Sequence, residues 1–217
     1  MANDQQNPTM LVVFDVDSTL IEQEVIELLA AKVGKAHDVA DVTERAMRGE
    51  LDFSSSLRAR VQTLTNMPVS ILDEVLNEIK ITKGAIELIE YIHSHRGKAA
   101  AVSGGFIELL EPLSKRLNLD FIRANTLETN NGFFTGDVIP PIIDKPAKAQ
   151  ALTEWANQLG ISLDRTVAIG DGANDLDMMA IAGVSIGFNP KPRVREAADH
   201  CIDSGDLFDA VNLLPKN

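Results

Sequence analysis

The sequence has very little cysteine: Cys201 is the single one among 217 residues. An intrachain disulfide is therefore excluded, which fits a reducing compartment. We expect Cys201 to be a small buried apolar residue. Residues 1–9 are polar and lack the basic stretch and apolar segment of a secretory signal, so we expect a cytoplasmic protein.

Positive charge is also scarce. The chain has 20 Lys and Arg against 32 Asp and Glu, which gives a formal net charge of −12 at pH 7. This charge repels nucleic acids and anionic membrane surfaces and argues against both as partners. No apolar run reaches the roughly 20 residues that span a bilayer. A small anionic substrate would need nearby Lys or Arg side chains to bind against this overall charge.

Apolar segments alternate with amphipathic ones along most of the chain. The apolar runs predict strands at 10–14, 98–102, 166–169 and 184–188, and a weaker one at 121–124. The amphipathic segments predict helices at 86–95, 107–117, 147–159 and 176–182. This alternation predicts an α/β fold with a Rossmann-like parallel sheet covered by helices on both faces.

Residues 22–80 interrupt this alternation, because they contain helical segments and no expected strand. The helical segments are 22–33, 38–48, 53–64 and 69–79. The stretch is too long for an ordinary crossover, so we interpret 22–80 as a small helical cap inserted into a core formed by 1–21 and 81–217. An elaborate crossover without a functional role is the alternative. Only residues 1–9 precede the first strand, so we expect no N-terminal regulatory domain.

A second irregular stretch covers residues 126–143. Asn130, Asn131 and Gly132 lie between apolar residues, which is a hairpin signal. We expect a short β-hairpin beside the main sheet.

Two acids, Asp15 and Asp17, directly follow the first predicted strand. They therefore lie at its carboxyl end, where ligands bind in open α/β sheets. Two close carboxylates repel each other, and a divalent cation is the usual way to keep both ionised; oxygen ligands favour Mg²⁺. The alternative is structural, because Asp17 or Ser18 could cap a helix.

Further polar segments follow other predicted strands. The run 170–175 brings Asp171 and Asp175 to the same edge of the sheet. Ser103-Gly104-Gly105 precedes a predicted helix, a junction that favours phosphate, although the same tripeptide could be a flexible turn. Lys145 or Lys148, at the start of another helix, could add a positive charge, or either could be an ordinary surface lysine.

Together these segments contain the groups that phosphoryl transfer needs. Catalysis of that reaction depends mainly on positioning and charge stabilisation. One carboxylate could attack phosphorus and form an aspartyl-phosphate, which divides the reaction into two steps. The other could protonate the leaving alkoxide and then activate water.

The motifs Asp15-Val16-Asp17-Ser18-Thr19, Ser103-Gly104-Gly105-Phe106, Lys148 and Gly170-Asp171-Gly172-Ala173-Asn174-Asp175 resemble those of the haloacid dehalogenase superfamily, most closely the phosphoserine phosphatase family. The resemblance extends from about Leu11 to Ile202. It implies that Asp15 is the nucleophile and Asp17 the general acid and base.

The same resemblance implies ligands for metal and phosphate. Mg²⁺ would be held by Asp15, by Asp17 through its backbone carbonyl, and by Asp171. Residues implied to hold the phosphate and the rest of the substrate are Ser103, Gly104, Lys148 and Asn174, with Asp175 as support. Lys148 is preferred to Lys145 because its distance along the chain to Gly160 and Asp171 fits the family's pattern.

Four residues of the predicted cap match positions that line the substrate pocket in phosphoserine phosphatases: Glu24, Met47, Phe53 and Arg60. Glu24 can pair with an ammonium group, and Arg60 can bind a carboxylate with two hydrogen bonds. Met47 and Phe53 can exclude water. Taken singly, each could equally be core or solvated helix surface. Arg58 competes with Arg60, and the spacing from Phe53 favours Arg60.

We therefore expect an enzyme, a monomer or homodimer, that hydrolyses O-phospho-L-serine to L-serine and phosphate. One alternative is transfer of the phosphoryl group to another alcohol such as homoserine. Another is hydrolysis of a different small phosphate ester, which Glu24 and Arg60 disfavour because both would lack a partner. A receiver-like phospho-aspartate signalling module is a remote alternative, since such modules carry the acceptor on a middle strand and lack a long helical insertion.

Overall fold

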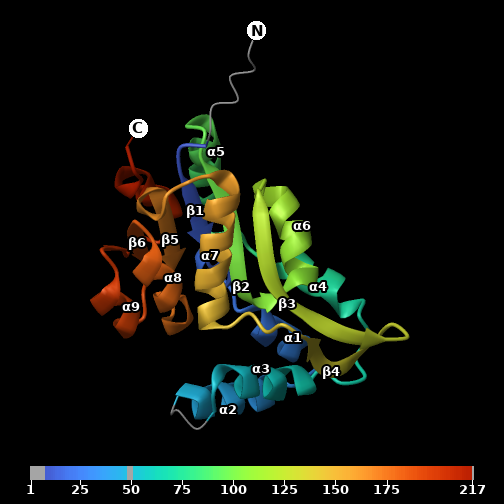
Figure 1. Ribbon diagram of the computed structural model, residues 1–217. Helices are drawn as coiled ribbons and strands as arrows, with labels where there is room; N and C mark the ends of the chain where they lie inside the picture. Colours follow the sequence, from blue (N-terminus) through green and yellow to red (C-terminus); the bar gives the residue numbers. More distant parts are fainter. Residues whose placement is uncertain (1–7, 48–50, 217) are drawn as a thin grey trace.

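The computed structural model describes residues 8–47 and 51–216. In this part of the chain one sheet has the strand order β4-β3-β2-β1-β5-β6-β7 (Figure 1). The strands are β1 (Leu11–Phe14), β2 (Lys98–Phe106), β3 (Phe121–Asn130), β4 (Phe133–Ile139), β5 (Thr166–Gly170), β6 (Val184–Phe188) and β7 (His200–Ile202). Neighbouring strands are parallel except β3 and β4, which are antiparallel. The predicted α/β fold is confirmed.

Strand β1 lies at the centre of the sheet, and its burial explains its apolar sequence. It pairs with β2 on one side and β5 on the other. Val12 and Phe14 belong to the hydrophobic cluster on one face of the sheet, whereas Leu11 and Val13 belong to the cluster on the opposite face. Because successive side chains point to opposite faces, a strand covered on both sides must be apolar throughout.

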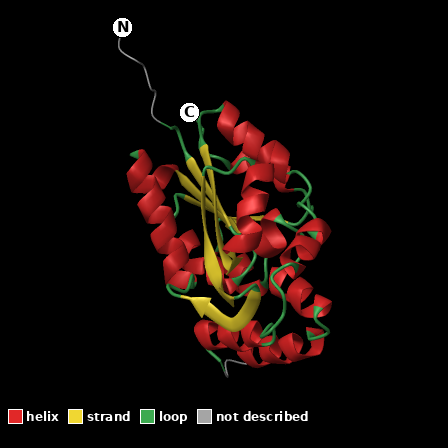
Figure 2. Ribbon diagram, turned by 90° about the vertical axis from the view of Figure 1, so that its right-hand side faces the viewer, coloured by secondary structure: helices red, strands yellow, loops and turns green. Residues whose placement is uncertain are grey.

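Helices cover both faces of the sheet, which Figure 2 shows edge-on between them. The helices are α1 (Val25–Lys32), α2 (Ala36–Met47), α3 (Phe53–Gln62), α4 (Ile71–Glu78), α5 (Ala85–Ser94), α6 (Ile107–Leu117), α7 (Lys145–Leu159), α8 (Leu176–Ile181) and α9 (Pro192–Ala197). Trp155 of α7 and Met178 of α8 pack on one face, and Leu88 of α5 and Leu110 of α6 on the other. Within the described residues, no helix has both the length and the apolar character needed to cross a membrane.

Helices α1 to α4 form the insertion between β1 and α5. The chain leaves and re-enters at one place, where Ile21 and Ile81 form an antiparallel bridge. The insertion also contacts the far end of the sheet, because the Asn66 N–H donates to the Phe134 carbonyl of β4 at 2.9 Å. In Figure 1, α2 and α3 lie beyond the carboxyl ends of the central strands. The division into a cap at 22–80 and a core stays a prediction.

Two expectations about strands differ from the structure. Strand β2 does not end at residue 102 but continues to Phe106, through Ser103-Gly104-Gly105. Strand β3 is one long element that joins the weak strand expected at 121–124 to the first arm of the hairpin. The hairpin is therefore an extension of the main sheet rather than a separate ribbon, because β3 pairs with β2 at its start and with β4 at its end.

The C-terminal part contains two elements that were not expected from the sequence, β7 and α9. The expectation that Cys201 is buried is wrong, because it is exposed on β7. Strand β7 has three residues and is the last strand at one edge of the sheet. Short polar edge strands carry little hydrophobic signal, which explains why this element was missed.

Candidate active site

The predicted polar segments meet at one edge of the sheet. Asp15 follows β1 and Asp171 follows β5, while Ser103 lies near the end of β2. Since these strands are parallel neighbours, their carboxyl ends lie side by side. A cavity of about 560 Å³ opens at this edge between the sheet and the helical insertion. Of the predicted site residues, those lining it are Asp15, Asp17, Glu24, Phe53, Arg60, Gly104, Asp171 and Asn174.

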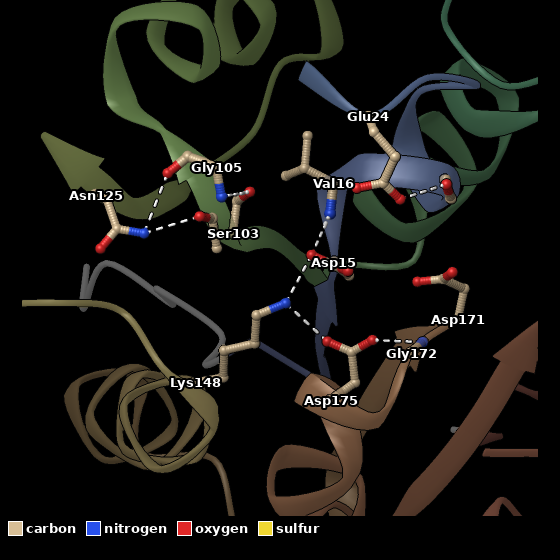
Figure 3. A network of polar contacts seen from close by, with 12 residues as sticks. Asp15, Val16, Glu24, Ser103, Gly105, Asn125, Lys148, Asp171, Gly172 and Asp175 are labelled. Carbon is tan, nitrogen blue, oxygen red and sulfur yellow. Dashed lines mark hydrogen bonds and ion pairs between the residues drawn. The ribbon is translucent and has the colours of Figure 1, made fainter. Parts of the chain in front are cut away.

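Asp15 is held rigidly at the end of the central strand. Its backbone N–H donates to the Ile169 carbonyl at 2.8 Å, which continues the sheet pairing by one residue. The residue is 3% exposed, and its carboxylate Oδ1 accepts hydrogen bonds of 2.7 Å from the Val16 N–H and from Lys148 Nζ (Figure 3). The side chain therefore has a fixed position and a compensated charge despite its burial.

Lys148 connects two acids beneath the cavity. It is 1% exposed, and Nζ donates to Asp15 Oδ1 and to Asp175 Oδ1 at 2.7 Å each (Figure 3). Burial by itself lowers the pKa of Lys148, but the two carboxylates raise it above its ordinary value, so it stays an ammonium. Lys145 instead pairs with Asp177 at 2.8 Å, and both of these side chains are about two-fifths exposed. The structure thus brings Lys148, rather than Lys145, to the site.

Asp171 and Asp175 come from the loop after β5. Burial, reinforced by the charge of Asp15, raises the pKa of Asp171 above its ordinary value and that of Asp175 to about 7. Asp175 Oδ2 accepts a hydrogen bond from the Gly172 N–H at 3.1 Å, and Asp171 Oδ2 pairs with Lys191 Nζ at 2.9 Å. Both pKa shifts have burial as their main cause and the like charge of Asp15 as the second.

Oxygen atoms of Asp15, Asp171 and Asp175 lie within 4.8 Å of one another. A buried group of carboxylate oxygens is the donor set that a hard divalent cation prefers. The cluster includes the predicted ligands Asp15 and Asp171. The predicted contribution of Asp17 is through its backbone carbonyl, so its side chain is not expected in the cluster.

Asp17 faces the cavity from the turn after Asp15. Ser18, with a φ of 56°, reverses the chain there. Asp17 Oδ1 is buried and has no hydrogen-bond partner among the described residues. Burial, followed by the charges of Glu24 and Asp15, raises the pKa of Asp17 well above its ordinary value. A carboxyl group that keeps its proton in this position is suited to donate that proton to a substrate.

Ser103 and Gly104 lie in a bulge of β2. Between Val102 and Phe106 this strand advances four residues while β3 advances two, from Arg123 to Asn125. Ser103 is 2% exposed, and its Oγ accepts a hydrogen bond from the Gly105 N–H at 2.8 Å. The flexible-turn interpretation of this segment is therefore wrong. The expectation of a loop leading into a helix also needs correction, because strand continues up to α6.

The glycines let the insertion approach this bulge closely. A Cβ atom on Gly104 would lie 3.1 Å from Cζ of Phe53, the first residue of α3. A Cβ atom on Gly105 would lie 2.9 Å from a methyl carbon of Val25 in α1. A Cβ atom at either position would require the facing side chain, Phe53 or Val25, to shift.

The remaining insertion residues differ in their placement. Glu24 Oε1 accepts a hydrogen bond from Ser18 Oγ at 2.9 Å. Arg60 is half-buried and lines the cavity, and burial lowers its pKa although Glu24 acts in the opposite direction. Arg58 pairs with Asp137 of β4 and does not line the cavity. The side chain of Met47 lies outside the described part of the structure.

The structure also brings residues to the site that sequence reasoning missed. Lys191 lines the cavity and pairs with Asp171, and its place just after β6 at the same sheet edge could have indicated it. Asn125 is fully buried against the β2 bulge. Its only sequence signal is a polar residue within a strand, which is weak.

Comparisons with known proteins now identify the class. The sequence pattern of haloacid dehalogenase-like hydrolases matches residues 12–180, and the chain belongs to this family. Within it, the chain is 46% identical over 204 residues to the phosphoserine phosphatase of Streptococcus thermophilus, covering 94% of this chain and 95% of that protein. It is 49% identical to phosphoserine phosphatase SerB2 of Mycobacterium tuberculosis, again over 94% of this chain but only 50% of that longer protein.

A solved structure of a phospho-aspartyl intermediate analogue of phosphoserine phosphatase has the same fold. It is 38% identical, with a TM-score of 0.90, and the match covers 96% of this chain and 100% of that one. The receiver-like interpretation is therefore wrong. The position of Asp15 does not exclude a receiver-like module, because β1 also lies in the middle of the sheet. The helical insertion and the family match exclude it.

Proposed function

We propose that this protein is a Mg²⁺-dependent phosphatase that hydrolyses O-phospho-L-serine to L-serine and phosphate. The observation that carries the proposal is that one cavity contains two sets of groups. Asp15, Asp171 and Gly104 can handle a phosphoryl group, and Glu24 and Arg60 can bind an amino acid. The similarity to phosphoserine phosphatases over most of the chain supports the same substrate.

In the first step Asp15 attacks phosphorus. Its hydrogen bonds from Val16 and Lys148 are both accepted by Oδ1, so Oδ2 is the atom that we assign to the attack. The new Oδ2–P bond forms as the P–O bond to serine breaks, and the product is an aspartyl-phosphate. The proton of the Asp17 carboxyl passes to the serine oxygen, which leaves as the alcohol.

In the second step Asp17, now a carboxylate, takes a proton from water. The resulting hydroxide attacks phosphorus, the bond to Asp15 Oδ2 breaks, and phosphate is released. The raised pKa of Asp17 matches both duties, because the group must hold a proton at the start and accept one later. Throughout, Lys148 stays cationic and compensates the charge of Asp15.

The acidic cluster fits Mg²⁺. Asp15, Asp171 and the backbone carbonyl of Asp17 are the ligands we propose, with Asp175 holding Lys148 in place. When bound, the cation neutralises charge on the phosphoryl oxygens and on the acids around them. The burial of Asp15 and Asp171, whose carboxylate oxygens lie close together, supports a cation at this point.

Glu24 and Arg60 supply the specificity. The substrate's ammonium group pairs with Glu24, and its carboxylate with the Arg60 guanidinium. Arg60 is partly removed from water, which strengthens such a pair. A phosphate ester without these groups would leave both charges unpaired in the cavity and is expected to react more slowly.

The proposal is tested by measuring phosphate release from phosphoserine, phosphothreonine and p-nitrophenyl phosphate, each with and without Mg²⁺. We expect metal-dependent release, with the highest kcat/KM for phosphoserine. Homoserine is added in parallel, because formation of phosphohomoserine would show transfer rather than hydrolysis. Release from p-nitrophenyl phosphate but not from phosphoserine would refute the substrate while leaving the phosphatase chemistry intact.

For location and assembly, we propose a cytoplasmic monomer or homodimer. The single cysteine, which excludes an intrachain disulfide, supports the location. Cell fractionation tests the location, and light scattering on the purified protein tests the assembly.

A further inference from the structure

Asn125 occupies an unusual position for a polar residue. It lies on β3 opposite Phe106, is 0% exposed, and adjoins the stretch where β2 and β3 lose their regular pairing. Buried carboxamides are costly unless their hydrogen-bonding groups find partners. The partners of Asn125 therefore indicate what the residue stabilises.

Among the described residues, the partners of its side chain lie in the β2 bulge and just before α7. Nδ2 donates to the Gly104 carbonyl at 2.9 Å and to the Gly105 carbonyl at 3.3 Å (Figure 3). Oδ1 accepts from the Ile143 N–H at 2.8 Å, two residues before the start of α7, the helix that carries Lys148. The contacts define one orientation of the carboxamide, because the reverse would place its oxygen against two carbonyl oxygens.

The contact with Gly104 reaches Ser103 through one rigid unit. The Gly104 carbonyl and the Gly105 N–H belong to the same peptide group, which is planar and trans, so they point in opposite directions. The carbonyl is held by Asn125, and the N–H donates to Ser103 Oγ at 2.8 Å. Since this bond occupies an acceptor site on the hydroxyl oxygen, the hydroxyl hydrogen remains able to donate to a phosphoryl oxygen.

We propose that Asn125 is a positioning residue for phosphate binding: through the Gly104–Gly105 peptide it orients the Ser103 hydroxyl. This inference rests on the proposed phosphatase function. It assigns to Asn125 no contact with the substrate and no role in the chemical steps.

A double-mutant cycle tests whether Asn125 acts through Ser103. We expect Asn125→Ala to lower kcat/KM and raise the inhibition constant of inorganic phosphate by roughly tenfold, the usual effect of losing buried hydrogen bonds at a site. In a Ser103→Ala background the same substitution should change kcat/KM by no more than about twofold, because the group that it positions is already absent.

The matched control is Ser185→Ala. Ser185 is also a buried polar residue of the sheet; its Oγ donates to Asp199 Oδ2 at 2.7 Å and it does not line the cavity. We expect its effect on kcat/KM to be small in both backgrounds. If Asn125→Ala and Ser103→Ala act additively, or if Asn125→Ala leaves phosphate inhibition unchanged in folded protein, the positioning role is wrong.

Asn125→Asp gives a second test with a pH signature. At pH 8 the new carboxylate faces the two glycine carbonyls without a hydrogen to donate, so activity should fall sharply. Protonation of this carboxyl restores a donor, so the ratio of variant to wild-type kcat/KM should rise as the pH falls from 8 to 5. A ratio that stays constant over this range contradicts the proposal, and circular dichroism verifies the fold at each pH.

Measurements on two substrates distinguish a failure of the Asn125 proposal from a failure of the substrate assignment. p-Nitrophenyl phosphate needs the phosphate site but neither an ammonium nor a carboxylate partner, so the cycle is run on it as well as on phosphoserine. If the wild-type protein cleaves only the aryl ester, the substrate assignment fails while the role of Asn125 is still measured. Should Asn125→Ala not fold, Asn125→Asp at pH 8 replaces it in the cycle.

Discussion

Individual residues of this site are distinguished from their neighbours by burial. Lys148 and Lys145 lie in the first turn of the same helix, yet Lys148 is enclosed between two carboxylates and Lys145 pairs at the surface. Arg60 and Arg58 differ in the same way. A buried charge interacts strongly with its partners, whereas an exposed pair is screened by water. Each neighbour therefore provides a control for the functional residue beside it.

Asp15→Asn should abolish turnover. The amide cannot act as the attacking carboxylate, so we expect kcat to fall by at least about a thousandfold. Phosphate release and circular dichroism are measured on the same preparation. The matched control is Asp177→Asn, which removes the partner of Lys145 and should alter kcat by no more than about twofold. Substantial activity in Asp15→Asn would assign the nucleophile elsewhere.

Arg60→Ala should discriminate between substrates. We expect kcat/KM for phosphoserine to fall by about a hundredfold, because charge-assisted hydrogen bonds to its carboxylate are lost. For p-nitrophenyl phosphate, which has no such carboxylate, the fall should be within a few-fold. Arg58→Ala should leave both values nearly unchanged. Equal losses on the two substrates in Arg60→Ala would mean that the insertion does not recognise the amino acid.

At the scale of secondary-structure elements, the ends of strands contribute both the site and its stability. The carboxyl ends of β1, β2 and β5 bring Asp15, Ser103 and Asp171 together. At the amino ends of the strands, Asp120 precedes β3 and connects it to β2 and α5. Its carboxylate accepts hydrogen bonds from Lys98 Nζ at 2.6 Å and from the Ala99 N–H at 2.9 Å, and contacts His93 Nε2 at 2.8 Å.

Asp120→Asn should lower stability in a pH-dependent way. Burial raises the pKa of Asp120, but its bonds to Lys98, Ala99 and His93 outweigh this and bring it below the ordinary value of 3.8. A lowered pKa means that the ionised group contributes stability above pH 3.8, and that this contribution is lost as the pH falls through the folded-state pKa. In urea unfolding we expect a loss of about 1 kcal/mol at pH 7.

The difference in the free energy of unfolding between Asp120→Asn and the wild-type protein should become smaller below pH 3.8. The control is Asp38→Asn, which removes a largely exposed pair with Lys35 and should cost about 0.5 kcal/mol or less. A difference in the free energy of unfolding that becomes larger in acid would contradict a lowered pKa of Asp120.

At the scale of the whole molecule, local and overall charge oppose each other. The chain carries a formal net charge of −12, yet the cavity and its floor contain Lys148, Lys191 and Arg60. These cations meet the requirement for an anionic substrate to bind to an acidic protein. The acids that line the cavity outnumber these three cations: they are Asp15, Asp17, Glu24, Glu27 and Asp171. A divalent cation would relieve this excess and so stabilise the folded state.

Mg²⁺ should therefore raise the free energy of unfolding. A ligand that binds only the folded state at 100 times its Kd adds about 2.7 kcal/mol. Thermal melting over a Mg²⁺ titration measures this independently of activity, and a chelator should reverse it. Asp171→Asn should weaken the shift strongly, whereas Asp203→Asn, which alters an exposed pair with Arg195, should leave it intact. A melting temperature insensitive to Mg²⁺ would argue against the metal site.

The insertion shows where prediction from the sequence ended. Four helical segments were expected within 22–80 and helices α1 to α4 lie there, because caps, glycines and apolar spacing act locally. The pairing of Ile21 with Ile81 and the contact of Asn66 with β4 join residues far apart in the chain, which no local pattern encodes. The β2 bulge was missed for the same reason, since it depends on β3.

The sequence by itself determined the class of fold and the acids at the strand ends. A strand buried on both faces must be apolar, and polar residues that follow it must lie at the edge of the sheet. Only the tertiary structure decided which cations and amides meet these acids. The bond from Lys148 to Asp15 spans 133 residues and that from Asn125 to Gly104 spans 21. Such contacts depend on how strands and helices pack, so they form only in the folded chain and cannot be predicted from local sequence.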